Sequence, residues 1–284
     1  MLVTMLDLLL SPVFLTVAIG SSLLASVAGA VGSISVLKGQ SLIGDALGNA
    51  AFPGVVIAFM LFETREPFIL ILGAAGSAFI GFLLIQKLNH KTKISLDVAL
   101  AVILSSFFGL GLVLKSYISG NEAYTGASQA GLQTYIFGQA SYVMERDVIA
   151  LFVICSISLV ILVLFYKELQ LHTFDQILAE SFGYKTKIMH GVIIAATLFL
   201  IAAGLKVVGA ILISSMLITP CVAAQAWVKS FKKVLIVSGF IGGISAFIGV
   251  AVATYFDGLA TGPCIIITMS LLCFISLLKA WVFK

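Results

Sequence analysis

The sequence contains few charged residues for its length. Of its 284 residues, 10% are Asp, Glu, Lys or Arg, whereas 61% are hydrophobic. A soluble domain carries about 25% charged residues, because a globule needs a polar surface. This shortage excludes a water-soluble enzyme, a nucleic-acid-binding module and a disordered scaffold. The mean hydropathy of +1.20 predicts an all-α polytopic membrane protein, since the apolar runs are too long for the strands of a β-barrel.

Motifs for enzymatic chemistry are also missing. The four cysteines form no CxxC or Cys/His spacing and each lies in an apolar run, so we interpret them as buried thiols. The sequence has no GxxxxGK[ST] loop for ATP and no HExxH motif of a metalloprotease. We therefore expect a protein that is not an enzyme and binds no cofactor permanently.

Nine apolar runs, separated by polar breaks, are candidate membrane spans. They cover residues 13–37, 46–62, 68–86, 98–114, 148–166, 191–205, 208–228, 234–255 and 262–282. The two runs that flank Lys206 are short and closely joined, so one of them can be re-entrant or broken. The sequence thus predicts a single integral-membrane domain over residues 1–284, with eight or nine spans.

The lysines and arginines are distributed unevenly between alternate breaks. One set of breaks contains 12 of the 16 basic residues and the other set contains 4. Because basic residues are retained on the cytoplasmic side, we assign the first set to the cytoplasm. The N-terminus then lies outside, and with nine spans the C-terminus lies inside.

Two polar segments are longer than simple connections. The segment 116–147 is expected outside the membrane and the segment 167–190 inside. In the inner one, Thr173 and Gln176 have capping-box spacing and Gly183 stands at a C-cap position, which predicts a helix of about nine residues. Its apolar stripe consists of Phe174, Ile177, Leu178 and Phe182. This helix is too short to span a bilayer, so we expect it to dock into a groove on a soluble partner.

Two acids lie at the ends of spans, Asp45 and Asp97. A carboxylate within a membrane is costly and suggests a transport pathway, but at the start of a helix it also caps free N–H groups. For Asp97 we favour the cap. Asp45 shares one helix face with Asn49, and Pro53 frees a backbone carbonyl near them. These oxygen atoms suit a hard divalent cation.

Residues 44–54 form a motif that resembles one of a known protein family. They resemble the Gly-Asp-Ala-hydrophobic-Ser-His-Ala-x-x-Pro-Gly motif of permeases in bacterial ABC importers for manganese, zinc and iron, with Gly48 in place of the small serine and Asn49 in place of the histidine. Further similar segments follow in the family's order. They are residues 93–100 with 108–111, residues 173–183, and residues 208–213 with 217–220. The resemblance covers nearly the whole chain.

The resemblance implies a type II ABC importer permease in the bacterial plasma membrane. It implies a second permease copy, cytoplasmic ATPase subunits that bind ATP, and an extracytoplasmic metal-binding protein. By resemblance, the transported divalent metal ion contacts Asp45 and Asn49. The residues expected to couple to the ATPase are Thr173, Phe174, Asp175, Ile177, Leu178, Phe182 and Gly183. The exposed residues expected to dock the binding protein are Glu122, Glu145, Arg146 and Asp147.

The asparagine at position 49 affects the expected cargo. A neutral amide oxygen is a weaker and harder ligand than imidazole, so zinc should be disfavoured most, with manganese or iron favoured. No histidine replaces it, because we expect His90, His172 and His190 to be solvated in cytoplasmic loops. The cargo is then handled at lower affinity, or arrives chelated, or is bound by Asp45 and backbone carbonyls alone.

The alternative function is a secondary metal transporter that is driven by an ion gradient and needs no ATPase. Such a carrier predicts two inverted halves with broken helices and more acids within the membrane. The sequence has neither feature, and the short docking helix would then lack a purpose.

Overall fold

The computed structural model describes residues 11–64, 66–120, 134–138, 145–210, 212–256 and 259–282, and over these residues the fold is helical without strands. Eight helices in this part of the chain are long and apolar enough to cross a membrane. They are α2 (Pro12–Leu37), α3 (Ile43–Phe62), α4 (Pro67–Lys91), α5 (Leu96–Ser119), α7 (Glu145–Leu164), α10 (Thr186–Val208), α12 (Phe231–Tyr255) and α13 (Thr261–Val282). The shorter helices are α6 (Thr134–Phe137), α8 (Tyr166–Phe174), α9 (Gln176–Ser181) and α11 (Ile213–Gln225).

The ninth apolar run forms a broken crossing. Helix α10 ends at Gly209, whose φ of 92° is outside the helical region, and α11 begins only at Ile213. With 13 residues, α11 is about 20 Å long, which is less than the thickness of the hydrocarbon core. The eight full spans are therefore confirmed. Lys206, expected in a break between spans, instead lies in the last turn of α10.

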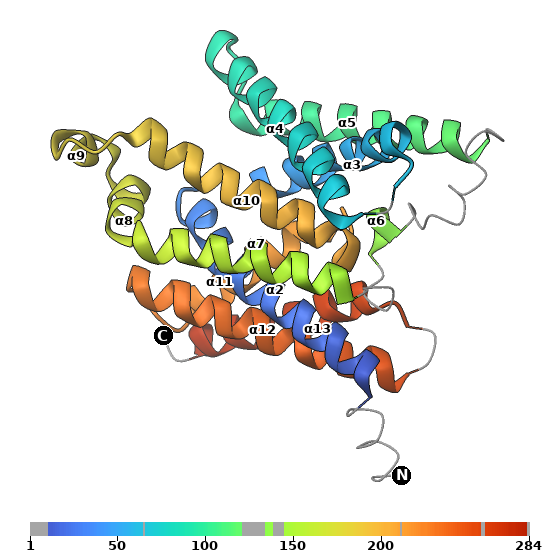
Figure 1. Ribbon diagram of the computed structural model, residues 1–284. Coiled ribbons are helices and arrows are strands. Elements are labelled where there is room, and N and C mark those ends of the chain that lie inside the picture. The colour runs from blue at the N-terminus through green and yellow to red at the C-terminus, as the bar shows by residue number, and fades with distance from the viewer. Residues whose placement is uncertain are drawn as a thin grey trace.

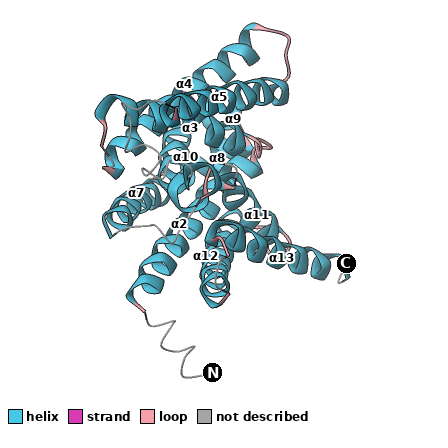
Figure 2. Cartoon of the chain, turned by 90° about the vertical axis from the view of Figure 1, so that its right-hand side faces the viewer, coloured by secondary structure: helices cyan, strands magenta, loops and turns pink. Residues whose placement is uncertain are grey.

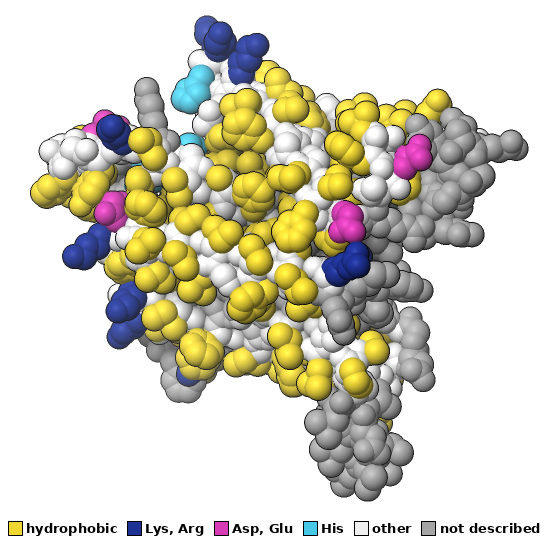
Figure 3. All heavy atoms as spheres, in the orientation of Figure 1, with side chains coloured by type: hydrophobic (Ala, Val, Ile, Leu, Met, Phe, Trp, Pro, Cys, Tyr) yellow, Lys and Arg dark blue, Asp and Glu magenta, His cyan; other side chains and the backbone are white. Residues whose placement is uncertain are grey.

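The helices form one bundle, and the start of the first long helix lies on the opposite side from the end of the last one. Helix α2 begins on the side of α6, whereas α13 ends on the side of α8 and α9 (Figure 1). This arrangement fits eight long spans plus one short crossing by α11. Figure 3 shows most of the Lys and Arg side chains on the α8–α9 side, which is the side that the sequence assigns to the cytoplasm.

Helices α2, α3 and α10 form the centre of the bundle. Most of the apolar stretch of each is buried, whereas α5 and α13 expose most of theirs to the surroundings. Helix α2 packs along α12, and Figure 2 shows α12, α11 and α13 on one side of it with α3, α4 and α5 on the other. The approach to α12 is so close that a Cβ at Gly243 would meet the Ser26 hydroxyl. Such contacts between small residues replace the hydrophobic effect as the packing force in lipid.

The inner polar segment forms two helices where the sequence predicted one. Helix α8 continues to Phe174, and the six-residue α9 starts at Gln176. The predicted capping box is wrong. Asp175 is the N-cap, and its carboxylate accepts a hydrogen bond from the Leu178 N–H at 2.8 Å, whereas the Thr173 hydroxyl donates to the Leu169 carbonyl within α8.

The glycine at the end of α9 acts as expected. Gly183 has a φ of 81°, and the Tyr184 N–H donates to the Ala179 carbonyl at 3.1 Å. This pair forms the wide hydrogen bond of a Schellman C-cap, which favours glycine because its backbone is left-handed. The six-residue helix is therefore fixed at both ends, at the start by Asp175 and at the end by Gly183.

Candidate functional site

Asp45 and Asn49 share one face of α3, as their spacing predicts. Asp45 is half-buried in the first turn, and Asn49 one turn later is 5% exposed. The Asn49 Nδ2 donates to the backbone carbonyl of Asp45 at 3.0 Å and reaches its Oδ1 at 3.3 Å. In the described part of the chain, no donor contacts the amide oxygen of Asn49. The structure thus holds a carboxylate and an amide side by side in a spanning helix.

The broken crossing brings α11 against this face. The Ser214 side chain, in the first turn of α11, lies beside the Asp45 carboxylate, close enough to interact with it. Gly44 and Gly48 flank Asp45 on α3, and α11 packs directly against both of them. A Cβ at Gly48 would meet the Ile213 side chain, and one at Gly44 would meet Leu217. The glycines admit α11, which brings the Ser214 hydroxyl to the carboxylate.

Pro53 is inside α3, four residues after Asn49. Because proline has no N–H, the Asn49 backbone carbonyl loses its helical donor. Helix α5 passes close at this level, since a Cβ at Gly111 would contact the Phe52 ring and the Pro53 nitrogen. The same helix face therefore offers one carboxylate, one amide oxygen and one freed carbonyl.

One copy of the chain does not supply a complete metal centre. Among the described residues, no group of three His, Cys, Asp or Glu side chains could hold an ion together. Six-coordinate hard cations need more oxygen ligands than Asp45 and Asn49 provide. The remaining ligands would have to be water, backbone carbonyls or groups from another chain, which suits brief contact better than tight storage.

The apolar stripe of the inner segment is exposed. Ile177 is 83% exposed and Phe182 is 68% exposed, with Leu178 between them also on the surface. Phe174 belongs to α8 and stacks edge-on with Phe231 of α12, with ring centroids 5.7 Å apart. A group of exposed apolar side chains on a polar segment is a candidate surface for contact with another protein or with the membrane. Phe174 thus anchors this surface to the bundle.

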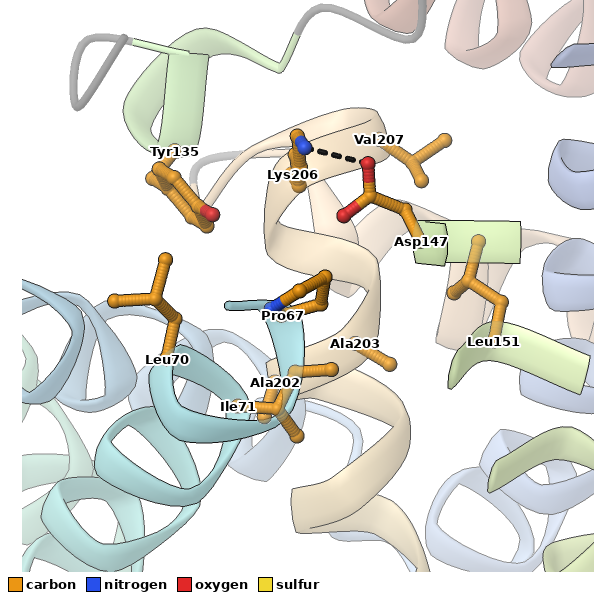
Figure 4. A pocket seen from close by; sticks show the side chains of 10 residues that line it. All are labelled: Pro67, Leu70, Ile71, Tyr135, Asp147, Leu151, Ala202, Ala203, Lys206 and Val207. Carbon is orange, nitrogen blue, oxygen red and sulfur yellow. Dashed lines mark hydrogen bonds and ion pairs between the residues drawn. The ribbon is translucent and has the colours of Figure 1, made fainter. Parts of the chain in front are cut away.

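The outer polar segment is different, because one of its acids is buried. Asp147 was expected on the surface, but it is 6% exposed. Its Oδ2 accepts a hydrogen bond from the Lys206 Nζ at 2.5 Å (Figure 4). Tyr135 of α6 lines the same small cavity, and burial, followed by the nearby Asp147 charge, raises its pKa. Its phenol therefore stays neutral.

The other three residues expected to dock the binding protein have different outcomes. Arg146 is exposed, and its Nη1 lies 3.1 Å from Glu66 Oε1 in an exposed ion pair. Glu122 lies outside the described residues, as does the side chain of Glu145. The outer segment contacts the bundle through its backbone as well, because the Ala210 N–H donates to the Tyr135 carbonyl at 2.9 Å.

The inner end of α2 carries a contact that the sequence did not reveal. His172 was expected to be solvated, but it is 3% exposed and its Nε2 lies 2.8 Å from Lys38 Nζ. Burial lowers the pKa of His172 to about 4, and the nearby charges of Lys38 and His190 contribute in the same direction. The imidazole is therefore neutral and accepts from the ammonium. No sequence signal points to this contact, since Lys38 and His172 are 134 positions apart.

Comparison with known proteins identifies the family of this chain. The ABC 3 transport family matches residues 11–280. The chain belongs to this family. The manganese transport system membrane protein MntC of Bacillus subtilis is 35% identical over 92% of this chain, which spans only 59% of that protein. The zinc transport system membrane protein TroC of Treponema pallidum is 34% identical, over 92% of this chain and 87% of its own length.

A solved structure supports the fold of this ABC 3 family member. PsaBC from Streptococcus pneumoniae, in complex with Fab, aligns over 97% of this chain and 95% of its own, with a TM-score of 0.85 and 26% identity. The resemblance noted in the sequence is therefore confirmed, as is the ABC permease fold. The relatives are membrane proteins of metal transport systems, which supports the importer and not the secondary carrier.

Proposed function

We propose that this ABC 3 family member is the permease that moves a divalent transition metal ion into the cytoplasm. The observation that carries the proposal is Asp45, a half-buried carboxylate in a spanning helix. Its described neighbours are the neutral groups of Asn49 and Ser214, and the ion pairs in the described residues are made by other acids. An acid without a cationic partner attracts a cation into the membrane, where such a charge is otherwise costly.

Asn49 would act as a second, weak ligand. In the structure its amide nitrogen faces Asp45. A half-turn of the amide about its last side-chain bond would point its oxygen at the same place, so that a cation would find two oxygens one helical turn apart. Oxygen ligands suit manganese or iron(II) better than they suit zinc, for which imidazole is the usual partner. We therefore favour manganese or iron as cargo, with zinc as the less favoured ion.

The remaining subunits of the proposed importer are separate polypeptide chains. The stripe formed by Ile177, Leu178 and Phe182 would seat α9 in an ATPase subunit, where ATP binds and is hydrolysed. Thr173 and Phe174 on α8, with Asp175 and Gly183 at the ends of α9, would hold that surface in place. An extracytoplasmic protein would deliver the metal near Arg146, together with Glu122 and Glu145, while Asp147 is buried. A second permease copy would complete the pathway.

The proposal is tested by ATP-driven uptake of manganese into vesicles that contain the chain and its ATPase subunit. Asp45→Asn keeps the shape and removes the charge, so uptake should fall to the level of empty vesicles. Asp97→Asn is the matched control, because this exposed acid also starts a spanning helix, and uptake should not change. Normal uptake by Asp45→Asn would reduce Asp45 to a helix cap, and uptake without the ATPase would favour the secondary carrier.

The same vesicles test the role of α9. Changing Ile177 and Phe182 to serine removes two exposed apolar side chains without opening a cavity, so the chain should remain folded. The ATPase should then dissociate and uptake should stop. Retained uptake with the ATPase still bound would exclude the stripe as its docking surface.

A further inference from the structure

Lysine and tryptophan side chains gather where α12 begins and α13 ends. Trp227 lies in the turn between α11 and α12. Lys279, in the last turn of α13, places its Nζ 3.5 Å from the centroid of the Trp227 ring. Lys229, Lys232 and Lys233 follow Trp227 within six positions, and all of them are exposed. We refer to Lys229, Lys232, Lys233 and Lys279 as the lysine cluster. The cation–π contact fixes one member of this cluster beside the others.

The charge of this cluster is not neutralised by nearby acids. The sequence has no Asp or Glu between residues 181 and 256, and none after 257. Within the described part of the chain, none of the four lysines forms an ion pair. On the neighbouring α8–α9 segment, Asp175 caps α9, Glu180 accepts a hydrogen bond from Thr186, and Glu168 forms no described ion pair with these lysines. The cluster therefore presents a net positive charge to its surroundings.

Backbone groups add to this positive surface. Ser230 is the N-cap of α12, but its side chain makes no capping hydrogen bond. The first N–H groups of a helix have no intrahelical acceptor, and the positive end of the helix dipole lies at the same place. Free N–H groups beside lysines form a suitable site for a phosphate group.

The lysine cluster borders exposed apolar side chains on the perimeter of the bundle. On α13, Phe274, Ile275 and Leu278 are exposed, and Trp281, one turn after Leu278, is 80% exposed. Trp227 is also half exposed. Tryptophan is enriched where the hydrocarbon core meets the headgroups, and lysines next to it extend toward the headgroup phosphates. Figure 3 shows Lys and Arg side chains at the end of the bundle where α12 begins, bordering an apolar face.

We propose that the lysine cluster binds the phosphate headgroup of an anionic phospholipid, in the leaflet on the α8–α9 side of the membrane. Trp227 and Trp281 would lie at the level of that headgroup, and the exposed apolar face of α13 would contact its acyl chains. This site is independent of the transported cargo. An acidic protein surface could also bind lysines, but it would not use the lipid-facing side chains that border this cluster.

The test uses the full-length chain in nanodiscs with equal amounts of phosphatidylglycerol and phosphatidylcholine. Lipids retained after extraction are counted by native mass spectrometry. A basic residue at a membrane surface favours an anionic lipid by about fivefold. The triple variant Lys229→Gln, Lys232→Gln, Lys233→Gln should therefore lower the ratio of retained phosphatidylglycerol to phosphatidylcholine at least about tenfold. All three side chains are exposed, so the variant should fold.

The matched control removes three other exposed lysines, Lys87, Lys91 and Lys93, from the end of α4 and the turn that follows it. This control removes the same charge on the same side of the bundle, away from the tryptophans, and should leave the ratio within about twofold of the wild type. An equal loss in both variants would show general surface attraction and overturn the proposal. Unchanged lipid retention in the first variant would also overturn the proposal.

Discussion

Asp45 and Asp147 are both carboxylates at the starts of long helices, but they differ in burial and in the side chains that they contact. Asp147 is more deeply buried and pairs with the Lys206 ammonium at 2.5 Å. Asp45 is half-buried and contacts the neutral side chains of Asn49 and Ser214. A neutralised acid joins α7 to α10 and stabilises the bundle, whereas an acid without a described cationic partner can attract a cation. We therefore propose a structural role for Asp147 and a transport role for Asp45.

The strongest way to break this comparison is to remove the partner of the buried acid. Lys206→Met removes the described cationic partner of Asp147, a carboxylate that is 6% exposed, which should lower the free energy of unfolding by about 3 kcal/mol or more. Thermal unfolding in detergent measures the change. The double variant with Asp147→Asn should recover much of the loss, because no charge then remains buried.

A matched control for this variant is the exposed ion pair on the same side. Arg146→Met breaks the contact with Glu66, but both side chains are in solvent, so stability should change by no more than about 0.5 kcal/mol. Equal unfolding temperatures for Lys206→Met and Arg146→Met would contradict a structural role for the Asp147–Lys206 pair.

The second prediction sharpens the role of Asp45 through its neighbour. Asn49→His places an imidazole one turn from the carboxylate, and imidazole is a stronger ligand for zinc than an amide oxygen. Competition uptake should therefore shift toward zinc over manganese by about tenfold, equivalent to about 1.4 kcal/mol. Asn49→Ala removes the amide without adding a ligand and should lower uptake of both ions alike. If the ratio does not move in Asn49→His, position 49 does not contact the metal.

The smallest expected effect concerns the hydroxyl on the Asp45 carboxylate. Ser214→Ala removes the hydroxyl beside the carboxylate, and the loss of one such polar contact costs about 0.7 kcal/mol. The manganese concentration for half-maximal uptake should rise about threefold while the maximal rate stays similar. Ser215→Ala, one position along α11, is the control and should behave as the wild type. A larger effect of Ser215→Ala than of Ser214→Ala would mean that Ser215 faces Asp45, which would contradict the structure.

The sequence predicted the spans well and the short segments less well. Solvation by lipid and water alone decides which apolar runs span the membrane and which side retains the charges, so the spans could be predicted without a structure. The cap of α9 was misassigned because Thr173 and Asp175 are both good capping residues. The chain continues α8 through Thr173, whose hydroxyl then bonds Leu169 within that helix. Local capping rules cannot choose between two neighbouring candidates when the preceding helix decides where its last turn ends.

By itself, the sequence determined that this chain is a helical membrane protein with a candidate cation contact at Asp45 and Asn49. The proximity of these two side chains was predictable because both residues lie on one helix, where spacing fixes the face. Tertiary structure alone decided that Asp147 pairs with Lys206, 59 positions away, that His172 is buried against Lys38, and that Ser214 reaches Asp45. These contacts join different helices, and they depend on how closely small residues let the helices approach, which periodicity along one helix does not encode.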